Sequence, residues 1–392
     1  MIYFDNNATT QIAPEVFDAM KPFLTEFYGN PSSAHTFGRE IRQMVENSRE
    51  QIARLIGANS PDEIIFTSGG TESDNWAILG SLEANPNKKH IVTTRVEHEA
   101  VRKLCEKLEK NSFEITWLEV DGQGFLDLDE LKKSLREDTV IVSVMLANNE
   151  TGILFPVAEV AEIVKANSNA IFHTDGVNAV GKIPIDLQKT QIDLFSLSGH
   201  KFHAPKGIGA LYIREGVNLP PFLIGGGQEN SRRAGTEAVH QIAAIGKAAE
   251  LTSNFLSEPS ASAGGLNATE RISALRNKLE DFILKNISSA KLNGTADRNF
   301  RLPNTLSISF ASTNGEAILA KLNDLEICVS TGSACNSETH TASPVMQALN
   351  IPYSDAMGVI RFSLGRFNIE NEIDFLLENL PNMITDLQEL SV

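Results

Sequence analysis

The sequence predicts an α/β protein with a large, mostly parallel sheet and a second, smaller α/β domain. Short apolar runs with strand character alternate with segments in which apolar residues recur at the 3.6-residue spacing of a helix. Glycine, asparagine and aspartate follow most of the apolar runs, so a turn separates each strand from the next helix. With 392 residues and 42% apolar content, the chain can bury more than one core. This β-then-α order favours parallel strands with helices on both faces of the sheet.

The large domain is expected to span residues 14–256. An amphipathic segment within it ends at Gly57, and glycine is the residue that most often follows a helix. The other helices are expected near Pro14, from about Thr71, around Val101 to Leu108, and from Val157. The expected strands are Ile64–Thr67, His90–Thr94, Phe113–Leu118, Val140–Leu146, Ala170–Thr174, Asp193–Ser198 and Ala210–Ile213.

The small domain is expected to combine residues 1–13 with residues 257–392. A polar, turn-prone stretch after Leu256 marks the boundary. The short N-terminal strand Ile2–Asp5 is expected to join this domain. Its other expected elements are the strands Thr305–Phe310 and Ile327–Ser330 and the helices Ile272–Leu284 and Ile369–Leu387.

Composition argues against several classes of function. The formal net charge of −16 disfavours a surface for nucleic acid or for an anionic membrane. The first residues lack the basic segment and apolar core of an export signal, and no long uncharged run occurs. We therefore expect a cytoplasmic protein that does not enter the membrane. Three cysteines are too few for a disulfide framework.

Five residues with complementary chemistry each follow a different predicted strand. They are Thr71, His98, Asn149, Asp175 and Lys201. In open α/β sheets the ligand lies outside the carboxyl ends of the strands, so we expect these five to share one pocket. Lys201 stands in S-G-H-K-F-H-A-P-K-G, between two histidines and a tight turn. On spacing alone it could also be an ordinary loop lysine.

Each of the other four residues has an ordinary structural interpretation. Thr71 with Asp74 fits a capping box, although a glycine turn before a helix also suits a phosphate group. Asp175 precedes a glycine and could form a turn, but the apolar strand before it would bury the carboxylate, which then needs a cationic partner. His98 could cap its helix, and Asn149 could be a turn asparagine.

Pyridoxal 5′-phosphate would suit these residues together: the glycine turn at Thr71 for its phosphate, the imidazole of His98 for its ring, and the buried Asp175 and Lys201 for its reactive groups. Its aldehyde requires a lysine, and its pyridine nitrogen requires an acidic partner. The sequence resembles the NifS/IscS-type cysteine desulfurases among the class V aminotransferase-like pyridoxal-phosphate enzymes. The resemblance runs from Y-F-D-N-N-A-T-T to I-R-F-S-L-G-R and includes Y-G-N-P-S-S, S-G-G-T-E-S-D-N, E-H-E-A, N-N-E-T-G, H-T-D-G, S-G-H-K, R-R-A-G-T and S-T-G-S-A-C. It implies the fold of the pyridoxal-phosphate-dependent transferases of fold type I.

The resemblance also implies roles for individual residues. Lys201 would form the Schiff base, Asp175 would pair with the pyridine nitrogen, and His98 would stack on the ring and shuttle protons. The phosphate would be held by Gly70, Thr71, Ser198 and His200, with Thr236 reaching in from the second subunit of a homodimer. Near the substrate, the implied residues are Asn149, beside the phenolic oxygen, and Arg361, which would clamp the substrate carboxylate. Many relatives carry glutamine where this chain has Asn178, so this cofactor contact is in doubt.

The three cysteines differ in their surroundings. Cys105 and Cys328 lie in apolar patterns and are expected to be small core residues. Cys335 lies in a polar stretch, about residues 330–343, that by resemblance is the persulfide-forming loop. A metal site shared by Cys328 and Cys335 is an alternative, but no second pair of ligands has suitable spacing, so we expect no metal.

The function implied by the resemblance is cysteine desulfuration. L-cysteine would give L-alanine and a persulfide on Cys335, which an iron–sulfur scaffold or another sulfur acceptor would take up. The sequence leaves open whether the sulfur serves iron–sulfur clusters in general, nitrogenase or tRNA thiolation. Two alternatives stay open: another pyridoxal-phosphate enzyme of this fold, such as a selenocysteine lyase or an aminotransferase, and a non-catalytic sulfur-carrier scaffold.

Overall fold

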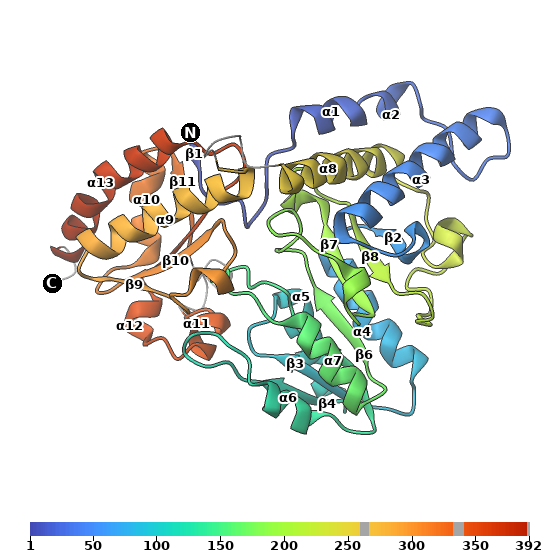
Figure 1. Ribbon diagram of the computed structural model, residues 1–392, viewed down its shortest axis with the longest axis horizontal. Helices are drawn as coiled ribbons and strands as arrows, with labels where there is room; N and C mark the ends of the chain where they lie inside the picture. The colour runs from blue at the N-terminus through green and yellow to red at the C-terminus, as the bar shows by residue number, and fades with distance from the viewer. Residues whose placement is uncertain (259–265, 332–340, 390–392) are drawn as a thin grey trace.

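A computed structural model of the chain describes residues 1–258, 266–331 and 341–389. A seven-stranded sheet forms its centre, in the order β2-β8-β7-β6-β5-β3-β4 (Figure 1). The strands are β2 (Ile64–Thr67), β3 (His90–Thr94), β4 (Glu114–Leu118), β5 (Thr139–Ser143), β6 (Ile171–Asp175), β7 (Leu194–Ser198) and β8 (Gly209–Ile213). Only β8 runs antiparallel to its neighbours in this sheet. The predicted α/β class with a mostly parallel sheet is confirmed.

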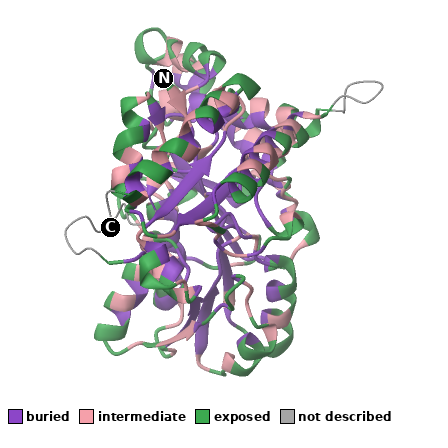
Figure 2. Cartoon of the chain, turned by 90° about the vertical axis from the view of Figure 1, so that its left-hand side faces the viewer, coloured by how far each residue is buried: buried purple, intermediate pink, exposed green. Residues whose placement is uncertain are grey.

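Helices cover both faces of this sheet. They are α1 (Pro14–Met20), α2 (Pro22–Thr25), α3 (Thr36–Ile56), α4 (Gly70–Ala84), α5 (Glu99–Lys110), α6 (Leu128–Ser134), α7 (Val157–Asn167) and α8 (Val239–Ser257). Consecutive residues of β3 point to opposite faces: Ile91 packs with residues of α4 and α5, and Val92 packs in the cluster that includes α3, α7 and α8. Figure 2 shows the strands buried in the middle and the exposed residues on the outer faces of the helices.

The helix predicted to end at Gly57 is α3. Its buried positions include Ile41, Val45 and Ile52, which keep the helical spacing. Gly57 follows it with a φ of 61°, and a Cβ there would lie 2.8 Å from the Cα of Asp186. Both the left-handed backbone and the close neighbour therefore require glycine at this position.

The remaining chain forms a second core around two smaller sheets. The strands of the antiparallel sheet, in order, are β12 (Ser330–Thr331), β13 (Val359–Ser363), β10 (Thr305–Phe310) and β9 (Ala290–Leu292). The N-terminal strand β1 (Ile2–Tyr3) pairs in parallel with β11 (Ile327–Cys328). The helices are α9 (Ala268–Asn286), α10 (Gly315–Asp324), α11 (Pro344–Ala348), α12 (Tyr353–Ala356) and α13 (Glu370–Glu389). Phe4 packs with residues of α9, β10 and α13, while the exact domain boundaries stay a prediction.

The expected strands differ from the structure in several places. The strand expected over Ile327–Ser330 is two strands, β11 and β12, which belong to different sheets. The strand expected over Val140–Leu146 ends at Ser143. Two strands are not expected from the sequence: β9, which is only three residues long, and β13, whose apolar run is interrupted by Arg361. Among the described helices, none is long and apolar enough to cross a bilayer.

Candidate active site

Residues that follow the strands of the large sheet line one cavity of about 220 Å³. Nine predicted site residues form part of its wall: Gly70, Thr71, His98, Asn149, Asp175, Asn178, Ser198, His200 and Lys201. Four further wall residues were not predicted as site residues: Ala8, Asp74, Met145 and Val177. The five strand-end residues therefore do share one pocket, as the topology predicts.

Lys201 is the last residue of the 3₁₀ turn η3 (Gly199–Lys201), directly after β7. Its Nζ donates hydrogen bonds to the backbone oxygens of Asn7 and Ala8, the second at 3.2 Å. Burial, and then the charge of Arg361, lowers the pKa of Lys201 to about 8. Part of this amine is therefore unprotonated near neutral pH, so it can act as a nucleophile or a base.

Asp175 ends β6 and is only 4% exposed. Its Oδ1 accepts a hydrogen bond from the N–H of Val177 at 2.8 Å, and no lysine, arginine or histidine of the described residues forms an ion pair with it. Burial, and then the nearby Asp74, raises the pKa of Asp175 to about 6. A cationic nitrogen of a ligand would stabilise this buried carboxylate, so the site fits a protonated pyridine ring.

Gly176 provides the turn that points Asp175 into the cavity. A Cβ at this position would lie 1.8 Å from the Cζ of Phe195, a fully buried ring. We expect Gly176→Ala to lower the free energy of unfolding by about 1–3 kcal/mol, because the ring cannot move without disturbing the core. Urea unfolding checks this, with Gly122→Ala as the control, since a Cβ at Gly122 meets only Leu349 O at 3.8 Å. Equal stability of the two variants would contradict the packing argument.

Asp74 has a different role from the one its spacing suggested. The interpretation of Thr71 and Asp74 as a capping box is wrong, because the N-cap residue of α4 is Gly69 and no side chain caps the helix. Asp74 is instead 1% exposed, its Oδ1 lies 3.5 Å from His173 Nε2, and burial raises its pKa to about 7. The sequence contained one signal of this burial: Asp74 lies one helical turn before Ile78, on the face of the helix that packs against the protein.

His98 caps α5 and lines the cavity at the same time. Its Nδ1 accepts a hydrogen bond from the backbone N–H of Ala100 at 3.1 Å. Burial lowers the pKa of His98, which favours the neutral ring. Because Nδ1 accepts, the proton of the neutral ring is on Nε2. The capping interpretation of His98 is therefore confirmed, and its ring also lines the cavity.

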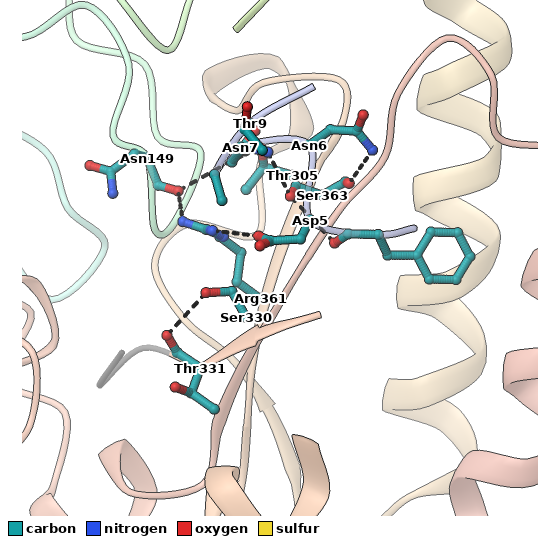
Figure 3. A network of polar contacts seen from close by, with 12 residues as sticks. Asp5, Asn6, Asn7, Thr9, Asn149, Thr305, Ser330, Thr331, Arg361 and Ser363 are labelled. Atoms are coloured by element: carbon teal, nitrogen blue, oxygen red, sulfur yellow. Dashed lines mark hydrogen bonds and ion pairs between the residues drawn. The ribbon is translucent and has the colours of Figure 1, made fainter. Parts of the chain in front are cut away.

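Arg361 lies beside the cavity rather than in its wall. It belongs to β13, and its guanidinium joins two distant segments (Figure 3): Nη1 donates to Asn149 O at 2.9 Å, and Nη2 pairs with Asp5 Oδ1 at 2.7 Å. Arg361 is 8% exposed, and its Nε has no hydrogen-bond partner among the described residues. A substrate carboxylate would therefore have to compete with Asp5 for the charge of this guanidinium.

The remaining predicted residues lie away from the cavity or outside the described residues. Thr236 is exposed and does not line the cavity. Cys105 is buried in the core as expected, and burial raises its pKa to about 12. Cys328 is only half-buried, so its expected place in the core is wrong. Cys335 lies outside the described residues, and among those described no cluster of three or more His, Cys, Asp or Glu residues is arranged to hold a metal.

Comparisons with known proteins point to one family. The family model described as aminotransferase class-V matches residues 2–376. A cysteine desulfurase of Trichormus azollae is 49% identical over 391 residues, which are 100% of this chain and 94% of that protein. The cysteine desulfurase IscS of Dictyoglomus turgidum is 48% identical, covering 100% of this chain and 96% of that protein. A solved structure of a NifS-like protein superposes with a TM-score of 0.89 at 38% identity, over 98% of this chain and 100% of that one.

Proposed function

The chain belongs to the aminotransferase class-V family, and within it to the cysteine desulfurases of the NifS/IscS type; from this premise we propose its reaction. With pyridoxal 5′-phosphate, the enzyme converts L-cysteine to L-alanine and leaves the sulfur as a persulfide on Cys335. The observation that carries the proposal is the pairing, in one cavity, of an amine with a pKa of about 8 and a buried carboxylate that has no ion-pair partner among the described residues.

The cavity wall suits the cofactor. The bound cofactor would supply an electron sink for the pair released at the substrate α-carbon. Asp175 would pair with the ring nitrogen. Gly70 and Thr71, in the first turn of the 15-residue helix α4, would offer backbone N–H groups to the phosphate. The hydroxyl of Ser198 and a ring N–H of His200 would also donate to it. Burial lowers the pKa of His200 to about 4, so its ring is neutral and carries one N–H donor.

Lys201 and His98 would divide the proton transfers between them. Lys201 Nζ removes the α-proton of the substrate, a task that requires the neutral amine. Nε2–H of His98 would donate the proton that completes the alanine side chain. Arg361 would bind the substrate carboxylate through its free N–H group, and Asn149 lies in the wall nearby.

The sulfur step uses the thiol outside the described residues. The thiolate of Cys335 attacks the substrate sulfur, the carbon–sulfur bond breaks, and its electron pair passes to the carbon, which is then protonated. Cysteine and the enzyme thiol thus give alanine and an enzyme persulfide without an external oxidant or reductant. A sulfur-acceptor protein, such as an iron–sulfur scaffold, would then remove the outer sulfur.

We propose that the enzyme acts as a homodimer, with Thr236 of the partner subunit reaching the phosphate. Thr236 is exposed in the single chain, and large apolar side chains are exposed as well: Tyr28 at 76% and Ile224 at 94%. Such side chains are typical of surfaces that a partner covers.

A direct experiment tests the proposal. The purified protein is reduced with borohydride, digested and mapped, and alanine formation from L-cysteine is measured in parallel. We expect the cofactor label on the peptide that contains Lys201, together with cysteine-dependent alanine. A label on another lysine, or a colourless protein that makes no alanine, would reject the proposal and favour the sulfur-carrier scaffold.

The lowered pKa of Lys201 also predicts the pH dependence of turnover. The α-proton moves to the unprotonated amine, whose pKa is about 8. We therefore expect kcat to rise with pH up to about 8 and to fall about tenfold for each pH unit below it. A steady-state profile from pH 6 to 9 checks this. A kcat that does not change between pH 6 and 8 would contradict the assignment of Lys201 as the base.

A further inference from the structure

The side-chain amide of Asn178 is held from both ends. Its Oδ1 accepts a hydrogen bond from Lys182 Nζ at 2.6 Å, and its Nδ2 donates to the backbone oxygen of Asn148 at 3.4 Å. A backbone carbonyl can only accept, so the NH₂ end of the amide must be the end that faces Asn148. The carbonyl end therefore faces Lys182, whatever the protonation state of that lysine.

Lys182 is buried without a charge partner. It is 8% exposed, its Nζ also donates to the backbone oxygen of Asn178 at 2.8 Å, and no carboxylate of the described residues pairs with it. Burial, and then the charges of Lys201 and Arg361, lowers its pKa well below the usual range. A buried amine costs free energy unless its hydrogen bonds are made, and both of its contacts here are to Asn178.

Lys182 lies behind Asn178 as seen from the candidate active site. It is absent from the wall of that cavity and belongs to the wall of a second cavity, which also includes Lys201, His203 and Arg366. Asn178, in contrast, lines the active-site cavity. Lys182 is therefore placed to act on the cofactor site through Asn178 and without touching a ligand.

We propose that Lys182 is a positioning residue that fixes the amide of Asn178 so that its NH₂ group donates a hydrogen bond to the phenolic oxygen of the cofactor. Nδ2 carries two hydrogens, Asn148 takes one, and the described residues provide no acceptor for the other. Asparagine is one methylene shorter than the glutamine of many relatives, and the contact with Lys182 holds this shorter side chain in one orientation. The inference rests on the proposed function and specifies one contact within it.

A double-mutant cycle tests the proposal on the loaded enzyme. The pH midpoint of the change in the visible absorption band of the lysine-bound cofactor is measured for the wild type, Lys182→Met, Asn178→Ala and the double variant. A donor stabilises negative charge on the phenolic oxygen, so losing it raises the midpoint. We expect each single variant to raise the midpoint by about 0.5–1 unit, the amount that corresponds to one hydrogen bond. The double variant should show no more than the Asn178→Ala shift.

Two outcomes would overturn the inference. If Lys182→Met raises the midpoint equally with and without Asn178, then Lys182 acts by its charge on Lys201, Arg361, His203 or Arg366, and not through the amide. If Lys182→Met leaves the midpoint unchanged, Lys182 has no positioning role. Should the methionine variant fail to load the cofactor, Lys182→Gln takes its place in the same cycle, with the same expected loss of effect when Asn178 is removed. A wild-type protein without a visible band would reject the proposed function itself, and this inference with it.

Discussion

Replacing Lys201 with alanine is expected to reduce alanine formation from L-cysteine by at least about 10²- to 10⁴-fold, the range lost when a general base is removed. The variant also loses the amine that would bind the cofactor covalently, so borohydride reduction should leave no label on the protein. No other lysine replaces it, because the described wall of the cavity contains only this one. Single-turnover alanine formation and mass mapping after reduction measure both effects.

Lys206→Ala is the matched control for this experiment. Lys206 lies five residues further along the same loop, is exposed, and has no part in the cavity wall. Its removal should change neither the label nor the rate. A Lys201→Ala protein that still carries a reducible lysine-bound cofactor would show that the reactive amine is elsewhere.

Replacing Cys335 with alanine is expected to abolish persulfide formation and alanine production while the cofactor absorbance stays at the wild-type level. The reason is chemical: without a thiolate to attack it, the substrate sulfur has no acceptor, whereas cofactor binding depends on residues of a different part of the chain. Persulfide labelling with ³⁵S-cysteine, alanine release and the absorption spectrum together measure the three quantities.

Cys328→Ala serves as the control for the thiol, because Cys328 is half-buried in β11 and also belongs to the small-domain part of the chain. That variant should keep both activity and absorbance. Alanine and sulfide made at normal rates by Cys335→Ala would rule out the persulfide role and favour an enzyme such as a selenocysteine lyase, which does not need this thiol.

Most of the cavity wall could be predicted because its residues obey a local rule. Polar residues that directly follow buried parallel strands meet at one edge of the sheet, so His98, Asp175 and Lys201 were recognisable from sequence alone. The end of α3 at Gly57 could likewise be predicted, because glycine adopts the left-handed backbone that commonly follows a helix. Such features depend on residues that are adjacent in the chain, and the sequence shows which residues are adjacent.

Other features depend on contacts between distant segments. The helical spacing of Asp74 indicates that it is buried, but only packing against the sheet reveals its contact with His173. The ion pair of Arg361 with Asp5 joins residues that are 356 positions apart. The strand that carries Arg361 is also not predicted, because the charged residue in its middle interrupts the apolar pattern typical of a buried strand. No periodicity in the sequence records such partners.

The bonds of the N-terminal segment set an order for assembly during synthesis. Asn7 accepts a hydrogen bond from Lys201 through its backbone oxygen and donates one to Ser363 Oγ through its backbone N–H, while Asp5 forms its ion pair with Arg361. Lys201 lies about midway along the chain, whereas Ser363 and Arg361 are translated close to its end. A nascent chain that stops before β13 lacks Ser363 and Arg361, so the bonds that join this segment to β13 cannot yet form.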